Sequence, residues 1–359
     1  MNTPTILVLV GITGDLSKRK LVPAIESLKE KGQLPEQFEL VGVTRKDSPL
    51  LFKMDLDKSE DYARLAEHLE KIESRWRMPA QRLFYLSVAP TVSLPIIKHL
   101  GESGLSAIPQ TKLLLEKPFG LDLKSAEAFI EGISEHFSEE QVYRIDHYLA
   151  KDTVRALSRL NIEKESVRQI KVSASEAIGI EGRAGFYEQT GALRDFIQSH
   201  LLEVAAMIIN PLHRLQALKN LFVPTDKEIP LYVQRGQYEG YREAVENPGS
   251  TVETKVSVSL RSHDPVLEGT EIVVETGKAL SKKSTDIAIS YKDGASHVIS
   301  LNDSTNAYEN VFTDAIAGDS EYFISKEEVL ETWRILAPIQ EYWKEHDEDL
   351  AVYEEGSVL

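Results

Sequence analysis

The first third of the chain alternates short apolar runs with longer amphipathic stretches. The apolar runs predict strands at residues 5–10, 38–43, 82–88, 112–115 and 141–143. Helices are predicted in the stretch that ends at Lys31 and at residues 57–76, where apolar side chains recur every three or four positions. Because parallel strands need a crossover connection, this alternation predicts a doubly wound parallel sheet.

The pattern changes in the second half. After a predicted strand at residues 167–177 and a predicted helix at 191–210, strand patterns follow one another at 251–260, 270–275, 285–291 and 296–301. Short polar turns between consecutive strands favour an antiparallel sheet. Helices at 308–317 and 327–344 close the chain. We therefore expect a Rossmann-like α/β domain at residues 1–146, followed by an α+β domain with a large, mainly antiparallel sheet at 147–359.

Composition narrows the possible chemistry. The 359 residues include 41 Lys and Arg, 57 Asp and Glu and no Cys, which gives a formal charge of −16. Without Cys there is no disulfide scaffold, thiolate nucleophile, iron–sulfur cluster or Cys-based zinc site, and we assign no metal ligands. The negative balance argues against a nucleic-acid partner. No apolar run suits a bilayer span and no secretory pattern opens the chain, so we expect a soluble cytoplasmic protein with no membrane partner.

A phosphate-binding turn is predicted directly after the first strand. Gly11-Ile-Thr13-Gly14-Asp15-Leu16 joins that strand to a helix. Glycine permits a tight turn and a close approach of the backbone, and the start of a helix attracts negative charge. The usual third glycine is missing, so an ordinary strand-to-helix turn remains the alternative at this point.

Two groups of cations strengthen the phosphate interpretation. Arg45 and Lys46 follow the second strand, where a site for NAD normally has an acidic residue, and a guanidinium there suits a 2′-phosphate. Lys18, Arg19 and Lys20 lie early in the first predicted helix. The alternative for each group is a solvated surface.

The segments that follow the last two parallel strands carry candidate substrate ligands. Lys117 comes just before Pro118 and is expected to point into the cleft beyond the strand ends. If a helix begins near Asp146, His147 and Lys151 share one face next to the hydroxyl of Tyr148 and form a receptor for a phosphate dianion. Asp146 could instead only cap that helix.

A general base is predicted farther along the chain. His200 lies on a helical segment with Asp195 and Gln198. A lone helical histidine is more often an interior residue, but a partner carboxylate such as Asp146 would make it a base near neutral pH.

These residues collectively resemble the glucose-6-phosphate dehydrogenase family. The blocks that carry the resemblance run in order along almost the whole chain: GITGDLSKRKL (11–21), RLFYLSVAP (82–90), EKPFG (116–120), RIDHYLAKD (144–152), EGRAGFYEQTGALRDFIQSHL (181–201), TGKAL (276–280), NAYENVFTDAIAGD (306–319) and ETWRILAPI (331–339). The RIDHYLxK block with RDxxQxH downstream is more specific than a dinucleotide fingerprint.

The resemblance implies a role for each candidate. The implied cofactor is NADP, with NAD as a second candidate. The resemblance implies that its pyrophosphate is contacted by Gly11, Thr13, Gly14, Asp15 and Leu16. It implies 2′-phosphate contacts from Arg45 and Lys46 and places Lys20 and Lys117 at the junction with the sugar. For the sugar phosphate, it implies Lys117, His147, Tyr148, Lys151, Glu176, Asp195, Lys278 and Lys283. His200 would be the base, oriented by Asp146, in the oxidation of β-D-glucose 6-phosphate to 6-phosphoglucono-1,5-lactone. A homodimer is also expected.

Three departures from the family pattern stand out. The chain is short, and the longer insertion that the family has after Arg45 is missing. The chain ends soon after the last helix, which affects the expected dimer interface. Glu275 stands where the family normally has Arg. Two rival functions remain at this stage. One is another NAD(P)-dependent sugar dehydrogenase of similar architecture, and the other is a non-catalytic NADP sensor.

Overall fold

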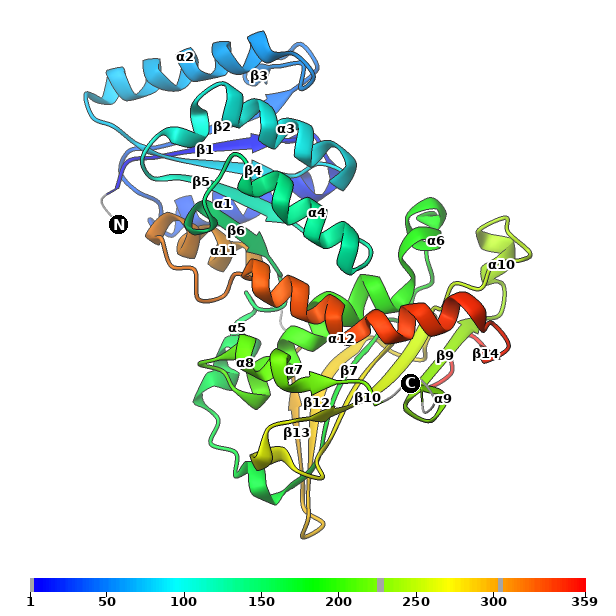
Figure 1. The fold of residues 1–359 in the computed structure, drawn as a ribbon. Helices are drawn as coiled ribbons and strands as arrows, with labels where there is room; N and C mark the ends of the chain where they lie inside the picture. The colour runs from blue at the N-terminus through cyan, green and yellow to red at the C-terminus, as the bar shows by residue number, and fades with distance from the viewer. Residues whose placement is uncertain (1–2, 225–228, 303–305) are drawn as a thin grey trace. The chain divides into compact units, whose positions relative to one another are not determined.

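The computed structural model describes residues 3–224, 229–302 and 306–359. The chain divides into two compact units (Figure 1). The first contains residues 1–120, 124–150 and 305–326, and the second contains residues 121–123, 151–304 and 327–359. The first unit thus takes in a late segment, which differs from the single boundary expected near residue 146.

The first unit is built on a six-stranded parallel sheet. Its strands are β1 (Thr5–Val10), β2 (Phe38–Thr44), β3 (Phe52–Lys53), β4 (Gln81–Leu86), β5 (Thr111–Glu116) and β6 (Val142–Ile145), in the order β3-β2-β1-β4-β5-β6. The predicted doubly wound sheet is confirmed. Because the strand order reverses beside β1, the carboxyl ends of β1, β2 and β4 frame a crevice, which is where ligands of such sheets bind.

Helices cover both faces of this sheet (Figure 1). They are η1 (Ser17–Leu21, a π-helix), α1 (Val22–Glu30), α2 (Ser59–Trp76), α3 (Pro90–Glu102), η2 (Leu105–Ala107), α4 (Leu123–Ser134), η3 (Glu139–Gln141) and α11 (Ala307–Ala317). Apolar residues of α1 and α11 pack against β1, β4 and β5 in one buried cluster. On the other face, α2 and α3 meet where the rings of Tyr62 and His99 lie 4.9 Å apart.

Polar contacts hold α11 on the sheet. Lys112 Nζ donates to the carbonyl oxygen of Ala315 at 2.6 Å, and Gln81 Nε2 donates to that of Ile316 at 2.9 Å. Burial lowers the pKa of Lys112 to about 8. Both donors bind carbonyl oxygens in the last turn of the helix, where backbone partners become scarce; the oxygen of Ala315 also accepts the N–H of Gly318 at 3.3 Å. These contacts explain why residues 305–326 belong with the first unit.

The second unit contains an eight-stranded sheet. Its strands are β7 (Val167–Ser175), β8 (Leu221–Phe222), β9 (Val233–Tyr238), β10 (Lys255–Ser262), β11 (Glu271–Gly277), β12 (Ser284–Tyr291), β13 (Ser296–Ser300) and β14 (Leu350–Tyr353). The order is β13-β12-β7-β11-β10-β9-β14, with β8 paired to β10. Only the pairs β7–β11 and β9–β14 are parallel among the described strands of this sheet, so the predicted mainly antiparallel sheet is confirmed.

Helices pack on one face of this second sheet. The helices of the unit are α5 (Asp152–Arg155), η4 (Ala156–Arg159), η5 (Lys164–Ser166), α6 (Ala184–Ala192), η6 (Leu193–Leu201, a π-helix), α7 (Leu202–Ile209), α8 (Arg214–Asn220), α9 (Ile229–Tyr232), α10 (Tyr241–Ala244), η8 (Pro265–Leu267) and α12 (Lys326–Glu345). Side chains of β10 and β12 alternate between buried and partly exposed, as expected when one face is covered. Gln198 Nε2 on η6 donates to Thr332 Oγ1 on α12 at 2.9 Å. Among the described helices, none has the length and apolar character that a bilayer crossing requires.

Candidate active site

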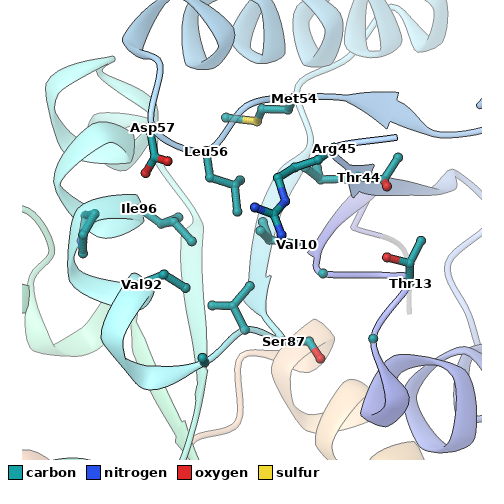
Figure 2. A pocket seen from close by; sticks show the side chains of 16 residues that line it. Val10, Thr13, Thr44, Arg45, Met54, Leu56, Asp57, Ser87, Val92 and Ile96 are labelled. Carbon is teal, nitrogen blue, oxygen red and sulfur yellow. The ribbon is translucent and has the colours of Figure 1, made fainter. Parts of the chain in front are cut away.

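The turn after β1 opens into a cavity of about 360 Å³ (Figure 2). Gly11 has φ of +87°, and a Cβ there would lie 2.2 Å from the carbonyl oxygen of Ser87, so only glycine fits. The N–H of Gly14 donates to the carbonyl oxygen of Gly11 at 2.9 Å, which closes the turn. Thr13 also lines the cavity. This backbone has the close approach that a pyrophosphate needs.

Arg45 lines the same cavity from the end of β2 (Figure 2). It is the only cation among the sixteen lining residues. A guanidinium beside a glycine turn suits a dinucleotide that carries an extra phosphate on its ribose. The glycine cradle and this cation together fit NADP. Lys46 is not among the lining residues of this cavity, and its backbone N–H donates to Thr44 Oγ1 at 3.2 Å.

The other predicted cofactor residues lie outside the lining of this cavity. Asp15 is exposed and pairs with Arg19 Nε at 3.2 Å, so each is partly neutralised by the other. Leu16 lies directly before η1. Lys20 is exposed on η1, and its carbonyl oxygen accepts a hydrogen bond from Asn306 Nδ2 at 2.9 Å.

A half-buried carboxyl group lies next to the predicted ligand Lys117. Glu116, at the end of β5, is hydrogen-bonded to the hydroxyls of Tyr85 and Tyr308. Burial raises the pKa of Glu116 to about 7, although the two hydroxyls and the neighbouring Lys117 act in the opposite direction. The Lys117–Pro118 peptide bond is cis. Lys117 therefore directly follows a residue whose side chain two tyrosine hydroxyls hold in place.

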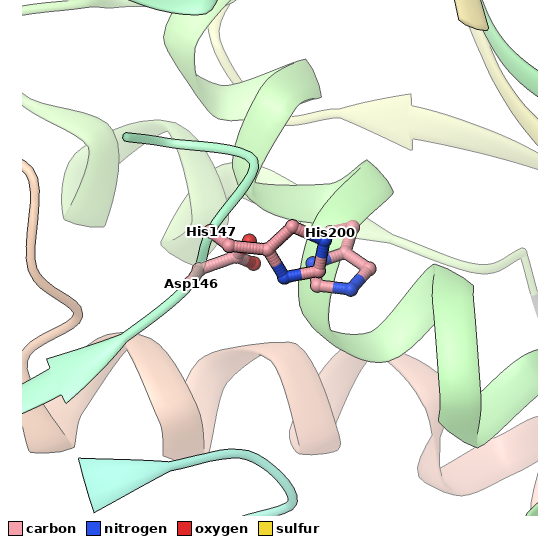
Figure 3. Close-up of side chains that lie close together, drawn as sticks. All are labelled: Asp146, His147 and His200. Atoms are coloured by element: carbon pink, nitrogen blue, oxygen red, sulfur yellow. The ribbon is translucent and has the colours of Figure 1, made fainter. Parts of the chain in front are cut away.

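Asp146 directly follows β6 and leads into a turn at residues 147–150, which contains His147 and Tyr148. Figure 3 shows the side chains of Asp146 and His147. Asp146 is buried, and its Oδ1 accepts a hydrogen bond from the backbone N–H of Tyr148 at 2.8 Å. The His147 ring stacks on Tyr308, with centroids 6.3 Å apart and planes at 16°. The edge of the Tyr148 ring meets His147 at 5.1 Å. The imidazole is thus fixed between two phenol rings.

The prediction that a helix begins near Asp146 is wrong. Residues 147–150 form a turn, and α5 begins only at Asp152, directly after Lys151. His147 and Lys151 therefore do not share a helical face. The alternative, that Asp146 only caps this helix, is wrong for the same reason: its carboxylate accepts the backbone N–H of Tyr148, two residues later, which is the local bond that makes Asp favour turns over helices.

In the second unit, two of the predicted substrate ligands form an ion pair. Lys278 Nζ pairs with the carboxylate of Glu176 and lies 5.2 Å from the centre of the Tyr187 ring. Burial raises the pKa of Tyr187 well above its usual value, and the carboxylates of Asp195, Glu253 and Glu176 act in the same direction. Lys278 and its partner Glu176 therefore lie at one buried phenol, whereas Lys283 is exposed.

His200 is also in the second unit, on η6 (Figure 3). Its side chain is buried, and the Phe196 ring lies against it with centroids 5.2 Å apart and planes at 77°. The helix is held at its start by Glu253, whose Oε1 accepts the N–H of Leu193 at 2.8 Å. Burial raises the pKa of Glu253. This interior carboxyl group thus fixes the helix that carries Asp195 and His200.

Glu275, which replaces the arginine expected from the family pattern, has its own partner. On β11 it pairs with Lys171 Nζ of the adjacent β7 at 2.6 Å. The substitution is therefore matched by a cation on the neighbouring strand.

Several residues of these sites are not predicted from the sequence. Tyr187 and Tyr308 lie within the family-like blocks at 181–201 and 306–319, so the blocks were the signal available, but nothing in their spacing predicted their ring contacts. Glu116 stood beside Lys117 in the EKPFG block without an assigned role. Its importance depends on two tyrosines that are distant in the sequence.

Comparison with protein families matches two models to almost the whole chain. The model "Glucose-6-phosphate dehydrogenase, NAD binding domain" matches residues 8–50 and 50–156, and "Glucose-6-phosphate dehydrogenase, C-terminal domain" matches residues 156–305 and 295–358. The first match is split at residue 50, within the segment after Arg45 where the family insertion was expected to be missing.

Individual relatives agree with this assignment. The glucose-6-phosphate 1-dehydrogenase of Bacillus subtilis is 29% identical, with 98% of this chain and 94% of the relative covered, and that of Chlamydia muridarum is 28% identical, with 95% and 90% covered. The latter alignment spans 458 positions against 359 residues here, so the relative carries segments that this chain lacks. A solved glucose-6-phosphate dehydrogenase in complex with glucose-6-phosphate has the same fold, with a TM-score of 0.89, 23% identity and coverage of 100% of this chain and 96% of the other.

Proposed function

This chain belongs to the glucose-6-phosphate dehydrogenase family, and we propose how its residues perform the reaction of that family. The protein is an oxidoreductase that converts glucose 6-phosphate to 6-phosphoglucono-1,5-lactone with NADP, in the pentose phosphate pathway. The match of both family models along nearly all of the chain carries this conclusion.

The cofactor is proposed to bind in the crevice of the first unit. We also propose that the cofactor-binding domain ends near residue 146 and that the substrate-binding domain follows it. Gly11, Thr13 and Gly14 would hold the pyrophosphate, with Asp15 and Leu16 completing the turn. Arg45 would grip the 2′-phosphate, assisted by Lys46, while Lys20 and Lys117 would lie near the junction with the sugar. The glycine-only backbone at Gly11 and the position of Arg45 in the cavity support this arrangement. When bound, the nicotinamide supplies the hydride acceptor.

For the substrate phosphate, we propose His147, Tyr148 and Lys151 as ligands. The support is that the His147 ring is held between Tyr308 and Tyr148, so its ring nitrogens have a fixed direction before any ligand arrives. Charge-assisted hydrogen bonds from cationic side chains suit a phosphate dianion. Loss of any of these residues should act mainly on substrate affinity.

The sugar hydroxyls are proposed to contact Glu176 and Asp195, with Lys117, Lys278 and Lys283 around the ring. The ion pair of Glu176 with Lys278 supports this role, because it holds a carboxylate and an ammonium side by side in a place with little exposure to water. A hydroxyl can then donate to the carboxylate and accept from the ammonium.

His200 is proposed as the general base that takes the proton of the anomeric hydroxyl. Both His200 and Asp146 are buried, with 2% and 1% of their surfaces exposed, and a buried imidazolium is costly without a counter-charge. Asp146 would hold the imidazole in one orientation and stabilise the charge that forms on proton transfer. We also propose that the protein is a homodimer and that it is cytoplasmic. Light scattering of the purified protein tests the dimer, and fractionation of cells tests the compartment.

An absorbance assay for NADPH formation tests the function directly. Purified protein should reduce NADP with glucose 6-phosphate, and kcat/KM should fall by orders of magnitude with glucose, which lacks the phosphate. Galactose 6-phosphate and fructose 6-phosphate test recognition of the sugar, and NAD replaces NADP in a parallel series. Equal use of glucose and glucose 6-phosphate would instead identify a different sugar dehydrogenase, and cofactor binding without turnover would identify a sensor.

A further inference from the structure

One wall of the dinucleotide cavity has no role in the arrangement above. It is formed by Met54, Leu56 and Asp57, which lie between β3 and α2, and by Val92 and Ile96 of α3 (Figure 2). Apart from Asp57, these side chains are apolar. A flat, mainly apolar ring would fit between them.

The order of the anchoring groups places the purine base at this wall. The pyrophosphate site is at the turn of Gly11 and Gly14, and the 2′-phosphate site is at Arg45, so the ribose lies between them. The base leaves the ribose on the side away from the pyrophosphate. Within the sixteen lining residues, that direction leads to Leu56, Asp57 and Ile96, which Figure 2 shows across the cavity from Thr13.

Asp57 is chemically distinct in this cavity. It is the only acidic residue among the sixteen that line it. Its neighbour Asp55 is occupied locally, since Oδ1 accepts the N–H of Asp57 at 3.3 Å and Oδ2 pairs with Lys58 Nζ at 3.6 Å. In contrast, within the described residues no hydrogen bond or ion pair engages the carboxylate of Asp57 itself.

We propose that Asp57 accepts a hydrogen bond from the 6-amino group of the cofactor's adenine and thereby selects adenine over a 6-oxopurine. An ionised carboxylate has acceptors and no donor, so it matches the exocyclic amino group. A 6-oxo group at the same place would set two acceptors against each other, and the carboxylate would have to shift towards the N1–H of the purine to regain a donor. Asp57 is exposed, so water moderates the penalty, and we expect a preference of about tenfold. The inference rests on the cofactor site proposed above.

Binding of two nucleotide fragments tests this inference without turnover. Isothermal titration calorimetry would measure Kd for adenosine 2′,5′-bisphosphate and inosine 2′,5′-bisphosphate, which differ at the 6-position of the purine. The unmodified protein should bind the adenosine form about tenfold more tightly. In Asp57→Asn, the amide can also donate to a 6-oxo group, so this ratio should fall to near one or reverse. The matched control is Asp47→Asn, which removes the same charge from an exposed residue that pairs with Lys53 and does not line the cavity.

Three results would overturn the inference. The first is equal affinity of the unmodified protein for the two nucleotides. The second is an equal shift of both affinities in Asp57→Asn, which would make Asp57 a general charge and not a reader of the base. The third is the same loss of selectivity in Asp47→Asn. If the unmodified protein binds neither nucleotide, the cofactor site itself is wrong. Steady-state kcat/KM for NADP against nicotinamide hypoxanthine dinucleotide phosphate gives a second measurement of the same ratio.

Discussion

The Tyr308 ring stacks on the His147 ring, with 6.3 Å between centroids and 16° between planes. The hydroxyl of the same tyrosine is hydrogen-bonded to Glu116. One side chain from α11 therefore joins the end of β5 to the turn after β6. The two segments that it joins carry Lys117 and His147, so Tyr308 is a positioning residue for both of these proposed substrate ligands.

Replacing Tyr308 should separate its two contacts. Tyr308→Phe keeps the ring against His147 and loses the hydrogen bond to Glu116, whereas Tyr308→Leu loses both. We expect KM for glucose 6-phosphate to rise about tenfold in the leucine variant and less in the phenylalanine variant, with smaller changes in kcat, because orientation of a phosphate ligand is lost. Steady-state kinetics measures the split. An unchanged KM in both variants would show that the stack does not position His147.

The raised pKa of the half-buried Glu116 should make stability depend on pH. Its pKa is raised from 4.5 to about 7, so the unfolded chain releases its proton at a lower pH than the folded protein. The contribution of this group is therefore present below about pH 4.5 and is lost as pH rises through 7. Relative to Glu116→Gln, which cannot ionise, the natural protein should lose about 2–4 kcal/mol of unfolding free energy between pH 4.5 and 8.

Urea unfolding at several pH values measures that difference. Glu127→Gln, which changes an exposed glutamate on α4, is the matched control and should show a nearly constant difference from the natural protein. Parallel pH profiles for the natural protein and Glu116→Gln would mean that Glu116 ionises in the folded protein as it does in the unfolded chain.

If His200 is the base and Asp146 orients it, their substitutions should not act independently. His200→Asn should lower kcat by about 10²–10⁴, with little change in KM, because it removes proton transfer in the transition state. Asp146→Asn should also lower kcat, and the double variant should be little worse than His200→Asn alone. Multiplicative losses in the double variant would indicate that the two residues work separately.

Gly191, which lies near the end of α6 and two residues before η6, should not tolerate any side chain. A Cβ there would lie 2.5 Å from Glu253 Oε1, and φ is +63°, so Gly191→Ala combines a steric clash with backbone strain. Gly182→Ala is the control, because Gly182 has φ of +77° with no atom within 4 Å of its Cβ position. We expect a loss of about 1 kcal/mol of unfolding free energy for Gly182→Ala and about 3 kcal/mol or more for Gly191→Ala. Urea unfolding of both variants measures these losses. Equal losses would mean that the Glu253 side chain moves aside at little cost.

The regular part of the fold was predictable because its signals are local. The buried parallel strands read as continuous apolar runs, and the strands β10 and β12 alternate because one face of their sheet is covered. The glycine turn and Arg45 were likewise predictable, since each depends on its position beside a strand.

Features set by distant partners could not be predicted in this way. The strand β9 has the polar sequence VQRGQY and is nevertheless buried, because Arg235 reaches Asp349 at 2.7 Å and lies 4.7 Å from the centre of the Trp343 ring. The turn at Asp146 is fixed in part by Asn310 Nδ2, which donates to the carbonyl oxygen of Ala150 at 2.9 Å. The sequence pattern of residues 144–152 alone does not indicate that contact, because Asn310 lies far along the chain.

The dependence of the parallel sheet on α11 has a consequence for biosynthesis. The six strands of this sheet are all synthesised long before Ala307 is added, so the apolar face of β1, β4 and β5 lacks the part of its cover that α11 supplies while residues 146–306 are being made. A premature stop codon anywhere in that interval would yield a product with the complete nucleotide crevice and an uncovered apolar face. Such truncated products should aggregate or be degraded, however intact their first 150 residues are.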